Sequence, residues 1–244
     1  MTWSIVARDP ESGAFGVAVA TRFFAVGARV PHAASGVGAV ATQALVNPFY
    51  GLRGLRLLRE AVPAADVIRL LTEADAGRDH RQVHAIDAAG RVAAHTGAAC
   101  VDWCGHVTGE GFSLAGNMLA GPRVLADTAA AYRESAALPF ARRLIAAMLA
   151  GEAAGGDKRG KQSAALVIYA AEDYADLDLR VDDHQEPLRE LDRLERVSRE
   201  RWVHFRRFLP SRADPVGVTD RDVIEAEIAR AMAAETQSGS EPIG

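Results

Sequence analysis

Apolar and polar residues alternate along several short segments of the chain, which is the period-two pattern of β-strands with one buried face. Residues 2–9 (TWSIVARD) and 15–22 (FGVAVATR) flank a turn at residues 10–13, and this arrangement predicts a β-hairpin at the start of the chain. Similar patterns predict further strands at 36–43, 82–87, 91–97, 111–117, 163–170 and 176–183. Short turns between successive strands favour antiparallel pairing.

Helical spacing of apolar residues separates these strand pairs. Asn47 followed by Pro48 predicts a helix start, with Asn at the N-cap and Pro at the first helical position. Further helices are expected at roughly 64–75, 122–134, 139–151 and 187–209, followed by a last short helix capped by Thr219 and a frayed tail from residue 237. Paired strands alternating with paired helices indicate an α+β fold in which helices cover antiparallel sheets.

Composition narrows the class of protein. The chain has 244 residues, of which 49% are hydrophobic and 25% charged, with a net charge of -4. This balance is ordinary for a globular protein and argues against a nucleic-acid surface. No apolar run approaches the ~20 residues that span a bilayer, the first residues lack the pattern of a signal peptide, and two cysteines are too few for a disulfide framework. We therefore expect a cytoplasmic protein with neither nucleic-acid nor membrane partners.

The first strand begins with a residue that could act as a nucleophile. Met1 precedes the small residue Thr2, so methionine aminopeptidase is expected to remove it. A Thr at a free N-terminus carries its own general base, because its α-amine, with a pKa near ~8, can accept the hydroxyl proton. Ser4 lies on the same face of the strand and could orient that amine. The other interpretation is that Thr2 is simply the second residue of an unremarkable chain end.

A set of motifs spread along the chain resembles the bacterial family known as domain of unknown function 1028. The resemblance covers roughly residues 2–195 and rests on TWSIVARD at 2–9, GVAVATR at 16–22, GAVATQALVN at 38–47, Gly97–Cys100 with Trp103, Gly105 and His106, the pair Gly116-Asn117, and GGDKRGKQSA at 155–164. That family is assigned to the N-terminal nucleophile (Ntn) hydrolases. The resemblance implies a four-layer α/β/β/α sandwich of antiparallel sheets over residues 1–195, with residues 196–244 as a helical extension.

The resemblance also implies roles for particular residues. The superfamily's first strand carries the nucleophile, which maps to Thr2, and its second strand supplies a supporting residue, which maps to Thr21 and Arg22. Oxyanion donors come from the end of the third strand, which maps to the segment from Gln43 to Asn47. Proteasome-like members use a Lys to lower the pKa of the amine. This chain has no Lys before residue 158, so Arg22 or Arg29 would have to supply the charge.

Two further segments hold polar residues that suit a site. Asn117 could donate to an oxyanion or cap the loop that follows it. The segment 155–163 misses the phosphate-binding P-loop pattern, because Gln rather than Ser or Thr follows its Lys. We expect it to line the mouth of a pocket, although a surface turn is the alternative. Its polar members are Asp157, Arg159, Gln162 and Ser163.

Three other groupings of reactive residue types also have ordinary structural interpretations. His80 and His84 have a spacing that suits a metal on a helix, but their segment resembles a loop entering a strand, so both are expected on the surface. Asp182 and His184 could act together as an acid/base pair, although salt bridges are the more ordinary role. Cys100, with Cys104 and His106 nearby, could be a nucleophile, but a buried small residue is the default.

The sequence therefore predicts a hydrolase of a linear amide C–N bond that acts on a small-molecule amide without metal or cofactor. A non-catalytic binding or structural module on the same fold is the alternative, and an enzyme using Cys100 or the Asp182/His184 pair is a third. The helix 187–209 carries Trp202, Phe205 and Phe208, more aromatic surface than one solvated helix is expected to expose, which predicts a homodimer or larger oligomer.

Overall fold

Two antiparallel β-sheets form the centre of the structure. The computed structural model describes residues 2–238, and within them every paired strand runs antiparallel to its neighbour. Contacts along the chain divide it into two compact units, Met1–Asp192 and Arg193–Gly244, where the sequence suggested a boundary after residue 195. The mixed α/β class with antiparallel sheets is confirmed.

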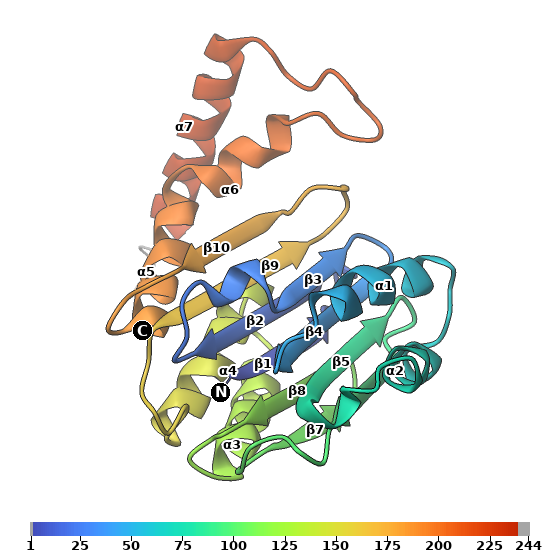
Figure 1. Cartoon of the computed structure of the whole chain (residues 1–244). Coiled ribbons are helices and arrows are strands. Elements are labelled where there is room, and N and C mark those ends of the chain that lie inside the picture. The colour runs from blue at the N-terminus through green and yellow to red at the C-terminus, as the bar shows by residue number, and fades with distance from the viewer. Residues whose placement is uncertain (1, 239–244) are drawn as a thin grey trace. The chain divides into compact units, whose positions relative to one another are not determined.

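The larger sheet, sheet A, has six strands in the spatial order β10-β9-β2-β1-β8-β7. Their bounds are Thr2–Arg8 for β1, Phe15–Thr21 for β2, Gly105–Gly109 for β7, Phe112–Asn117 for β8, Ser163–Tyr169 for β9 and Leu177–Val181 for β10. The first strand of the chain thus lies inside the sheet, with a neighbour on each side (Figure 1). Because β8 comes more than a hundred residues later, this position depends on distant parts of the sequence.

The smaller sheet, sheet B, has four strands in the order β3-β4-β5-β6. They span Pro31–Ala34, Gly38–Ala44, Arg81–Asp87 and Val92–Thr96. The sequence pattern predicted the last three of these strands but missed β3 and, in sheet A, β7. Both missed strands lie at a sheet edge, and neither is fully buried on one face, so the alternation that identifies a strand is weak there.

The two sheets share one core. Alternate side chains of β1 and β2 pack with alternate side chains of β4 and β5 in a single buried cluster, which includes Val6, Val17 and Val19 from sheet A and Ala39, Ala41 and Ile86 from sheet B. To this cluster β4 contributes two alanines, whose small side chains allow the two sheets to pack close together. The polar residues at the ends of the same strands continue this interface.

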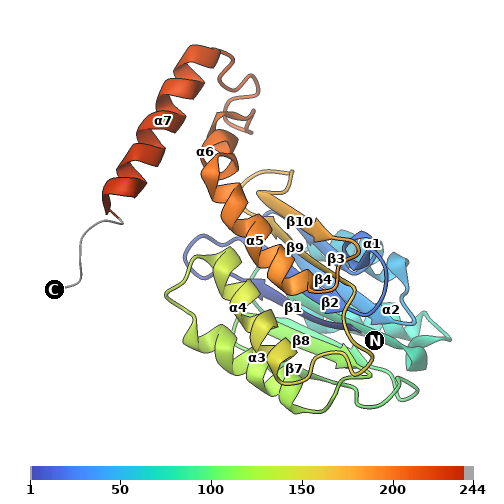
Figure 2. The same ribbon diagram turned by 90° about the vertical axis from the view of Figure 1, so that its left-hand side faces the viewer.

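Helices cover the other face of each sheet. On sheet B lie α1 (Pro48–Arg59) and α2 (Ala64–Glu73), which pack Leu58, Val67 and Leu71 against the outward side chains of β4 and β5 (Figure 1). As predicted, Asn47 caps α1 by accepting a hydrogen bond from the Phe49 N–H. On sheet A lie α3 (Arg123–Glu134) and α4 (Phe140–Ala153) (Figure 2).

The C-terminal unit corrects two expectations. Instead of one helix over 187–209, α5 (Pro187–Glu200) ends before Arg201, whose φ of -149° is not helical, and α6 (Trp202–Phe205) then leads into a 3-10 turn. The last helix, α7 (Arg221–Ser238), has 18 residues rather than being short, and the Asp220 carboxylate caps it in place of Thr219. The expected frayed tail falls largely on residues 239–244, which lie outside the described residues.

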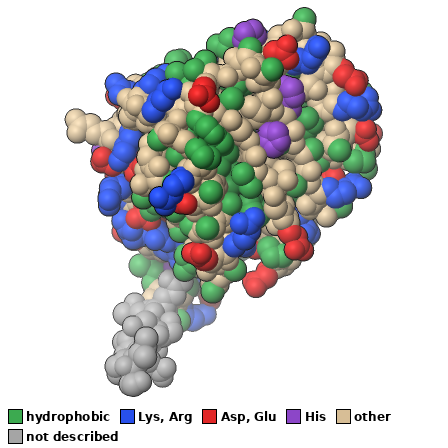
Figure 3. Space-filling view, turned by 90° about the horizontal axis from the view of Figure 1, so that it is seen from below, with side chains coloured by type: hydrophobic (Ala, Val, Ile, Leu, Met, Phe, Trp, Pro, Cys, Tyr) green, Lys and Arg blue, Asp and Glu red, His purple; other side chains and the backbone are tan. Residues whose placement is uncertain are grey.

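The face drawn in Figure 3 shows no single dominant charge. On the face in Figure 3, acidic and basic side chains lie intermixed around the edges, and a band of hydrophobic side chains runs between them. Over residues 2–238, none of the helices combines the length and the apolar character that crossing a membrane requires.

The close approach of α1 to sheet B gives a first test. A Cβ on Gly51 would lie 2.0–2.3 Å from the His32 ring, whereas a Cβ on Gly121 would meet nothing within 4 Å. Gly51→Ala is expected to lower the free energy of unfolding by about 1–3 kcal/mol through overpacking, although Ala is the better helix former. Gly121→Ala is the matched control and should be near neutral. Urea unfolding of both variants measures the difference, and a stabilised Gly51→Ala variant would contradict the packing.

Candidate functional site

A row of four polar side chains runs across four adjacent strands at one end of sheet A. Thr2 in β1 pairs with Asn117 in β8 on one side and with Thr21 in β2 on the other, and Thr21 pairs in turn with Ser163 in β9. Directly paired residues of antiparallel strands share a face of the sheet. All four are at most 8% exposed. The Thr2 hydroxyl donates a hydrogen bond of 3.1 Å to the Thr21 hydroxyl oxygen. The row thus brings together four residues that the sequence analysis proposed separately.

Two amide side chains hold the backbone of Thr2. Its carbonyl oxygen accepts hydrogen bonds from Gln43 Nε2, at 3.2 Å, and from Asn117 Nδ2, at 3.5 Å. Gln43 belongs to sheet B and Asn117 to sheet A, so the first residue of β1 is fastened to both sheets at once. This arrangement fixes the direction in which the Thr2 side chain leaves the strand.

Behind Thr2, a hydrogen-bonded network fills the space between the sheets. Gln43 Nε2 also donates to Gln82 Oε1 at 3.1 Å, and Asn117 Nδ2 donates to the same oxygen at 2.8 Å. Gln82 in turn donates to the Gly116 carbonyl at 2.7 Å. Ser4 donates to Gln43 Oε1 at 2.6 Å. Every buried side-chain nitrogen and oxygen of this network has a partner, which offsets the cost of burying polar groups.

The network also defines the protonation of a buried histidine. Because Ser4 uses its only proton on Gln43, its oxygen must accept from His84 Nε2, which lies 2.9 Å away. The other ring nitrogen, Nδ1, is then the acceptor for the Ser113 hydroxyl at 3.1 Å. Burial lowers the pKa of His84 to about 3, with a smaller contribution from His106. The ring is therefore neutral, with its proton on Nε2.

His84 corrects the sequence analysis, which placed it on the surface. His80 is exposed, but His84 is fully buried. Gln82 and Ser113, the other members that the sequence analysis missed as site residues, are fully buried as well. The strand pattern contained a signal for this burial. Gln82, His84 and Ile86 alternate with Val83 and Ala85, and a strand in a sheet that is covered on both faces buries both sets of side chains.

At the β9 end of the polar row, a short loop closes over the strand ends. Ser163 donates to the Phe23 carbonyl at 2.5 Å and accepts from the Val26 N–H at 3.1 Å. Asp157, whose side chain is 1% exposed, accepts from the Arg22 N–H at 2.8 Å and pairs with Arg159. These contacts bring the segment 155–163 to the row. Of the four residues expected at a pocket mouth, only Gln162 lines the neighbouring cavity, whereas Asp157, Arg159 and Ser163 hold the loop in place.

An open cavity of about 760 Å³ lies beside this loop. Its lining includes Arg22 and Gln162, each of which directly adjoins a member of the polar row, and residues from Asp183 to Glu186 on the connection that leaves β10. The Gln162 N–H donates to the Thr21 carbonyl at 3.0 Å. Cavity and row therefore share one end of β2 and β9.

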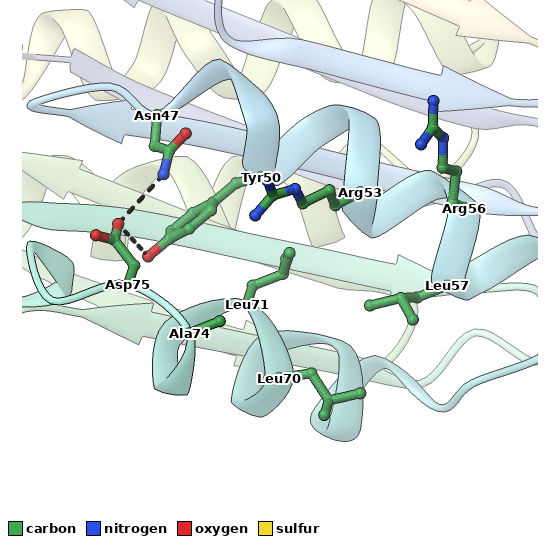
Figure 4. A pocket seen from close by; sticks show the side chains of 9 residues that line it. All are labelled: Asn47, Tyr50, Arg53, Arg56, Leu57, Leu70, Leu71, Ala74 and Asp75. Carbon is green, nitrogen blue, oxygen red and sulfur yellow. Dashed lines mark hydrogen bonds between the residues drawn. The ribbon is translucent and has the colours of Figure 1, made fainter.

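Asn47, the remaining predicted site residue, lies in a different place. Its Nδ2 donates to Asp75 at 3.2 Å, and the Tyr50 hydroxyl donates to the same carboxylate oxygen at 2.8 Å (Figure 4). The hydrogen bond from Tyr50, with others from Gly77, Asn47 and Arg81, lowers the pKa of Asp75 to about 2. This group closes one end of a second cavity, of about 360 Å³, between α1 and α2. Asn47 thus joins two helices and does not bond to the Thr2 network.

The alternative sites find less support. Asp182 pairs with Arg180, and His184 Nδ1 accepts from the Glu186 N–H, so Asp182 and His184 do not form an acid/base pair. Burial raises the pKa of both Cys100 and Cys104, which reduces the reactive thiolate at neutral pH. Within residues 2–238, no group of three or more His, Cys, Asp or Glu side chains is placed to hold a metal ion.

The buried His84 predicts a pH dependence of stability. Its pKa is lower in the folded protein than its ordinary value of 6.5, so below pH 6.5 the unfolded chain binds a proton at His84 and the folded protein does not. The contribution of the neutral ring to the unfolding free energy is therefore complete above pH 6.5 and is lost as the pH falls towards 3. We expect the wild type to lose up to about 1.4 kcal/mol of unfolding free energy per pH unit in this window relative to His84→Gln.

Urea unfolding between pH 7 and 4 measures this slope, with His80→Gln as the exposed control that should follow the wild type. Nitrogen chemical shifts of the imidazole provide a second readout that needs no variant. A protonated His84 ring in the folded protein at pH 5 would contradict the network.

The comparisons with known proteins agree with each other over most of the chain. The model of the family of unknown function DUF1028 matches residues 2–191. The crystal structure of a DUF1028 protein from Silicibacter pomeroyi is similar, with a TM-score of 0.84 and 34% identity over 90% of this chain and 96% of that one. A comparison with curated proteins gave no significant match.

Two distant structures are forms of Anbu, described as an ancestral beta-subunit. The protein from Yersinia bercovieri has a TM-score of 0.39 and 11% identity, covering 81% of this chain and 97% of that one. A Gly-1 mutant from Hyphomicrobium sp. strain MC1 has a TM-score of 0.35 and 12% identity, covering 83% and 96%. Scores this low carry no argument about fold or chemistry. The family match and the Silicibacter structure do, and this chain belongs to the family of unknown function DUF1028.

Proposed function

We propose that this protein hydrolyses a linear amide C–N bond of a small molecule, with Thr2 as an N-terminal nucleophile after removal of Met1. The observation that carries the proposal is the placement of Thr2, whose hydroxyl lies in the polar row at one end of sheet A while two amides hold its carbonyl. The resemblance to Ntn hydrolases suggests the same residue. We also propose that the two sheets with their outer helix pairs form the four-layer sandwich of that superfamily.

The bond changes and proton transfers of the proposed reaction involve only groups of Thr2, the substrate and water. Thr2 Oγ1 attacks the amide carbon, and its proton passes to the α-amine of the same residue. The amine then gives this proton to the leaving nitrogen as the C–N bond breaks, which leaves an ester on Thr2. Water attacks the ester, the amine takes a proton from it, and that proton returns to Oγ1. The products are a carboxylic acid and an amine.

Gln43 and Asn117 receive a different role from the one that the sequence suggested. Their side-chain N–H groups are engaged with the Thr2 carbonyl and with Gln82, so they act as positioning residues rather than oxyanion donors. A nucleophile held in one orientation avoids part of the entropic cost of reaching the transition state. The proposal keeps the oxyanion donors among backbone N–H groups of the segment 43–47, apart from that of Leu45, which donates to the His80 carbonyl.

The alternative is a non-catalytic module, in which the same network only fastens the sheets together. Both interpretations require the buried amides, so stability measurements do not separate them. Chemical reactivity of Thr2 does, because a structural threonine has no reason to react faster than any other buried hydroxyl.

A covalent probe tests the nucleophile. An alkyne-bearing β-lactone, which acylates a reactive hydroxyl, is expected to label Thr2, as shown by peptide mapping. Thr2→Ala should lower the labelling rate by ~10³ or more, because the covalent route is lost. Thr2→Ser keeps both hydroxyl and amine and should retain labelling. Ser4→Ala is expected to weaken labelling without abolishing it. Labelling that persists in Thr2→Ala, or that maps to Cys100, would overturn the proposal.

The role of the free amine has a separate test. Intact-mass analysis should show a chain that begins at Thr2. Inserting one Gly between Met1 and Thr2 preserves the hydroxyl but moves the amine one residue away, so labelling should fall to the level of Thr2→Ala. A chain that retains Met1, or an insertion variant that reacts like the wild type, would show that the amine is not the base.

We propose a homodimer as the assembly state. Of the three aromatic residues behind this prediction, Trp202 is 37% exposed, whereas Phe205 and Phe208 are half-buried. Val216 and Val223 of the same unit are 70% and 47% exposed, and a second copy could cover such apolar side chains. The ring of Trp202 also lies 6.4 Å from that of Phe205. Sedimentation at micromolar concentration is expected to show a dimer that Trp202→Ser weakens, and a monomeric wild type would remove the proposal.

A further inference from the structure

The cavity beside Thr21 carries two opposite charges that the protein does not compensate. Arg22 and Asp183 both line it. The Arg22 guanidinium donates to the Arg159 carbonyl at 3.2 Å, and Asp183 accepts from Gln162 Nε2 at 3.1 Å. Among residues 2–238, neither side chain forms a salt bridge. Each is held by a neutral partner and keeps its charge available to a ligand.

The other charged side chains at this cavity are already paired. Lys161 lies 3.0 Å from Glu152 and 2.5 Å from Glu186, so both the lysine and Glu186 are compensated within the protein. The nearby Arg159 pairs with Asp157. A ligand that matches what remains therefore carries one anionic and one cationic group.

The two free charges are also anchored. The Arg22 N–H is bound to the buried Asp157 carboxylate, which fixes the backbone from which the guanidinium extends. Gln162, which holds Asp183, donates its own N–H to the Thr21 carbonyl. Anchoring lowers the conformational cost of binding. His184 also lines the cavity, and its Nδ1 accepts from the Glu186 N–H.

The position of this cavity connects it to the proposed nucleophile. Arg22 follows Thr21, which accepts the hydrogen bond of the Thr2 hydroxyl, and Gln162 precedes Ser163 in the same row. The cavity therefore adjoins the row through Arg22 and Gln162, while Thr2 itself is not among its lining residues.

We propose that this cavity selects an amide substrate that carries both a carboxylate and an ammonium group, as a short peptide with free ends does. Arg22 binds the carboxylate and Asp183 binds the ammonium. The identification of the bound molecule as a substrate rests on the proposed function. Charge recognition by the cavity can be measured without any reaction.

Calorimetric titration of the Thr2→Ala variant separates binding from chemistry. The probes are trialanine, N-acetyl-trialanine, which lacks the ammonium group, and trialanine amide, which lacks the carboxylate. We expect each blocked peptide to bind about 1.5- to fivefold more weakly than trialanine, the range of an exposed ion pair. Arg22→Gln should remove the difference between trialanine and its amide, and Asp183→Asn should remove the difference between trialanine and the acetylated peptide.

Matched controls distinguish recognition from general electrostatics. Arg29→Gln removes an exposed arginine that likewise bonds to a backbone carbonyl, and Asp182→Asn removes the carboxylate next to Asp183; neither residue lines the cavity. Both controls should preserve the full selectivity. Absent trialanine binding, equal binding of all three peptides, or an equal loss for all three in Arg22→Gln would overturn the inference. Charge-selective binding together with an unreactive Thr2 would instead overturn the proposed function, while the proposal that the cavity recognises both charges would stand.

Discussion

The structure depends on the requirement that polar groups buried between two sheets find hydrogen-bond partners. Gln43 and Gln82 are paired neighbours in sheet B, and their amides reach across to Thr2, Asn117 and the Gly116 carbonyl of sheet A. A slip of one residue in any of these strands would turn the amides to the opposite face and leave several groups unpaired. The network therefore specifies the register of both sheets and, with it, the position of Thr2.

Much of the fold could be predicted from the sequence, because strong local signals marked it. Alternation identified β1, β2 and the hairpin of β5 and β6, and the Asn-Pro pair marked the start of α1. The edge strands β3 and β7 lack a fully buried face, and the sequence between α5 and α6 keeps helical spacing across Arg201, where the backbone leaves the helical region. Local patterns do not contain the tertiary contacts that decide such positions.

The site was predictable only in part, for a similar reason. The sequence suggested each residue of the polar row separately, namely Thr2, Thr21, Asn117 and Ser163. The strand order of sheet A, which places them side by side, could not be predicted from local patterns. Asn47 looked like an oxyanion residue on its motif, whereas its amide bonds to Asp75 from α1. His84 looked exposed because histidines usually are, and its burial between Ser4 and Ser113 becomes visible only when two sheets are brought together.

The interior place of β1 has a consequence for the order of events during synthesis. Thr2 leaves the ribosome first, yet the Asn117 that bonds to its carbonyl lies 115 positions later in the chain. At bacterial elongation rates this separation corresponds to an interval on the order of ten seconds, during which the first strand has no neighbour on that side. Until β8 has been synthesised, the first strand therefore lacks one of the two neighbours that hold it inside sheet A. The completion of sheet A is thus placed late in synthesis by its topology.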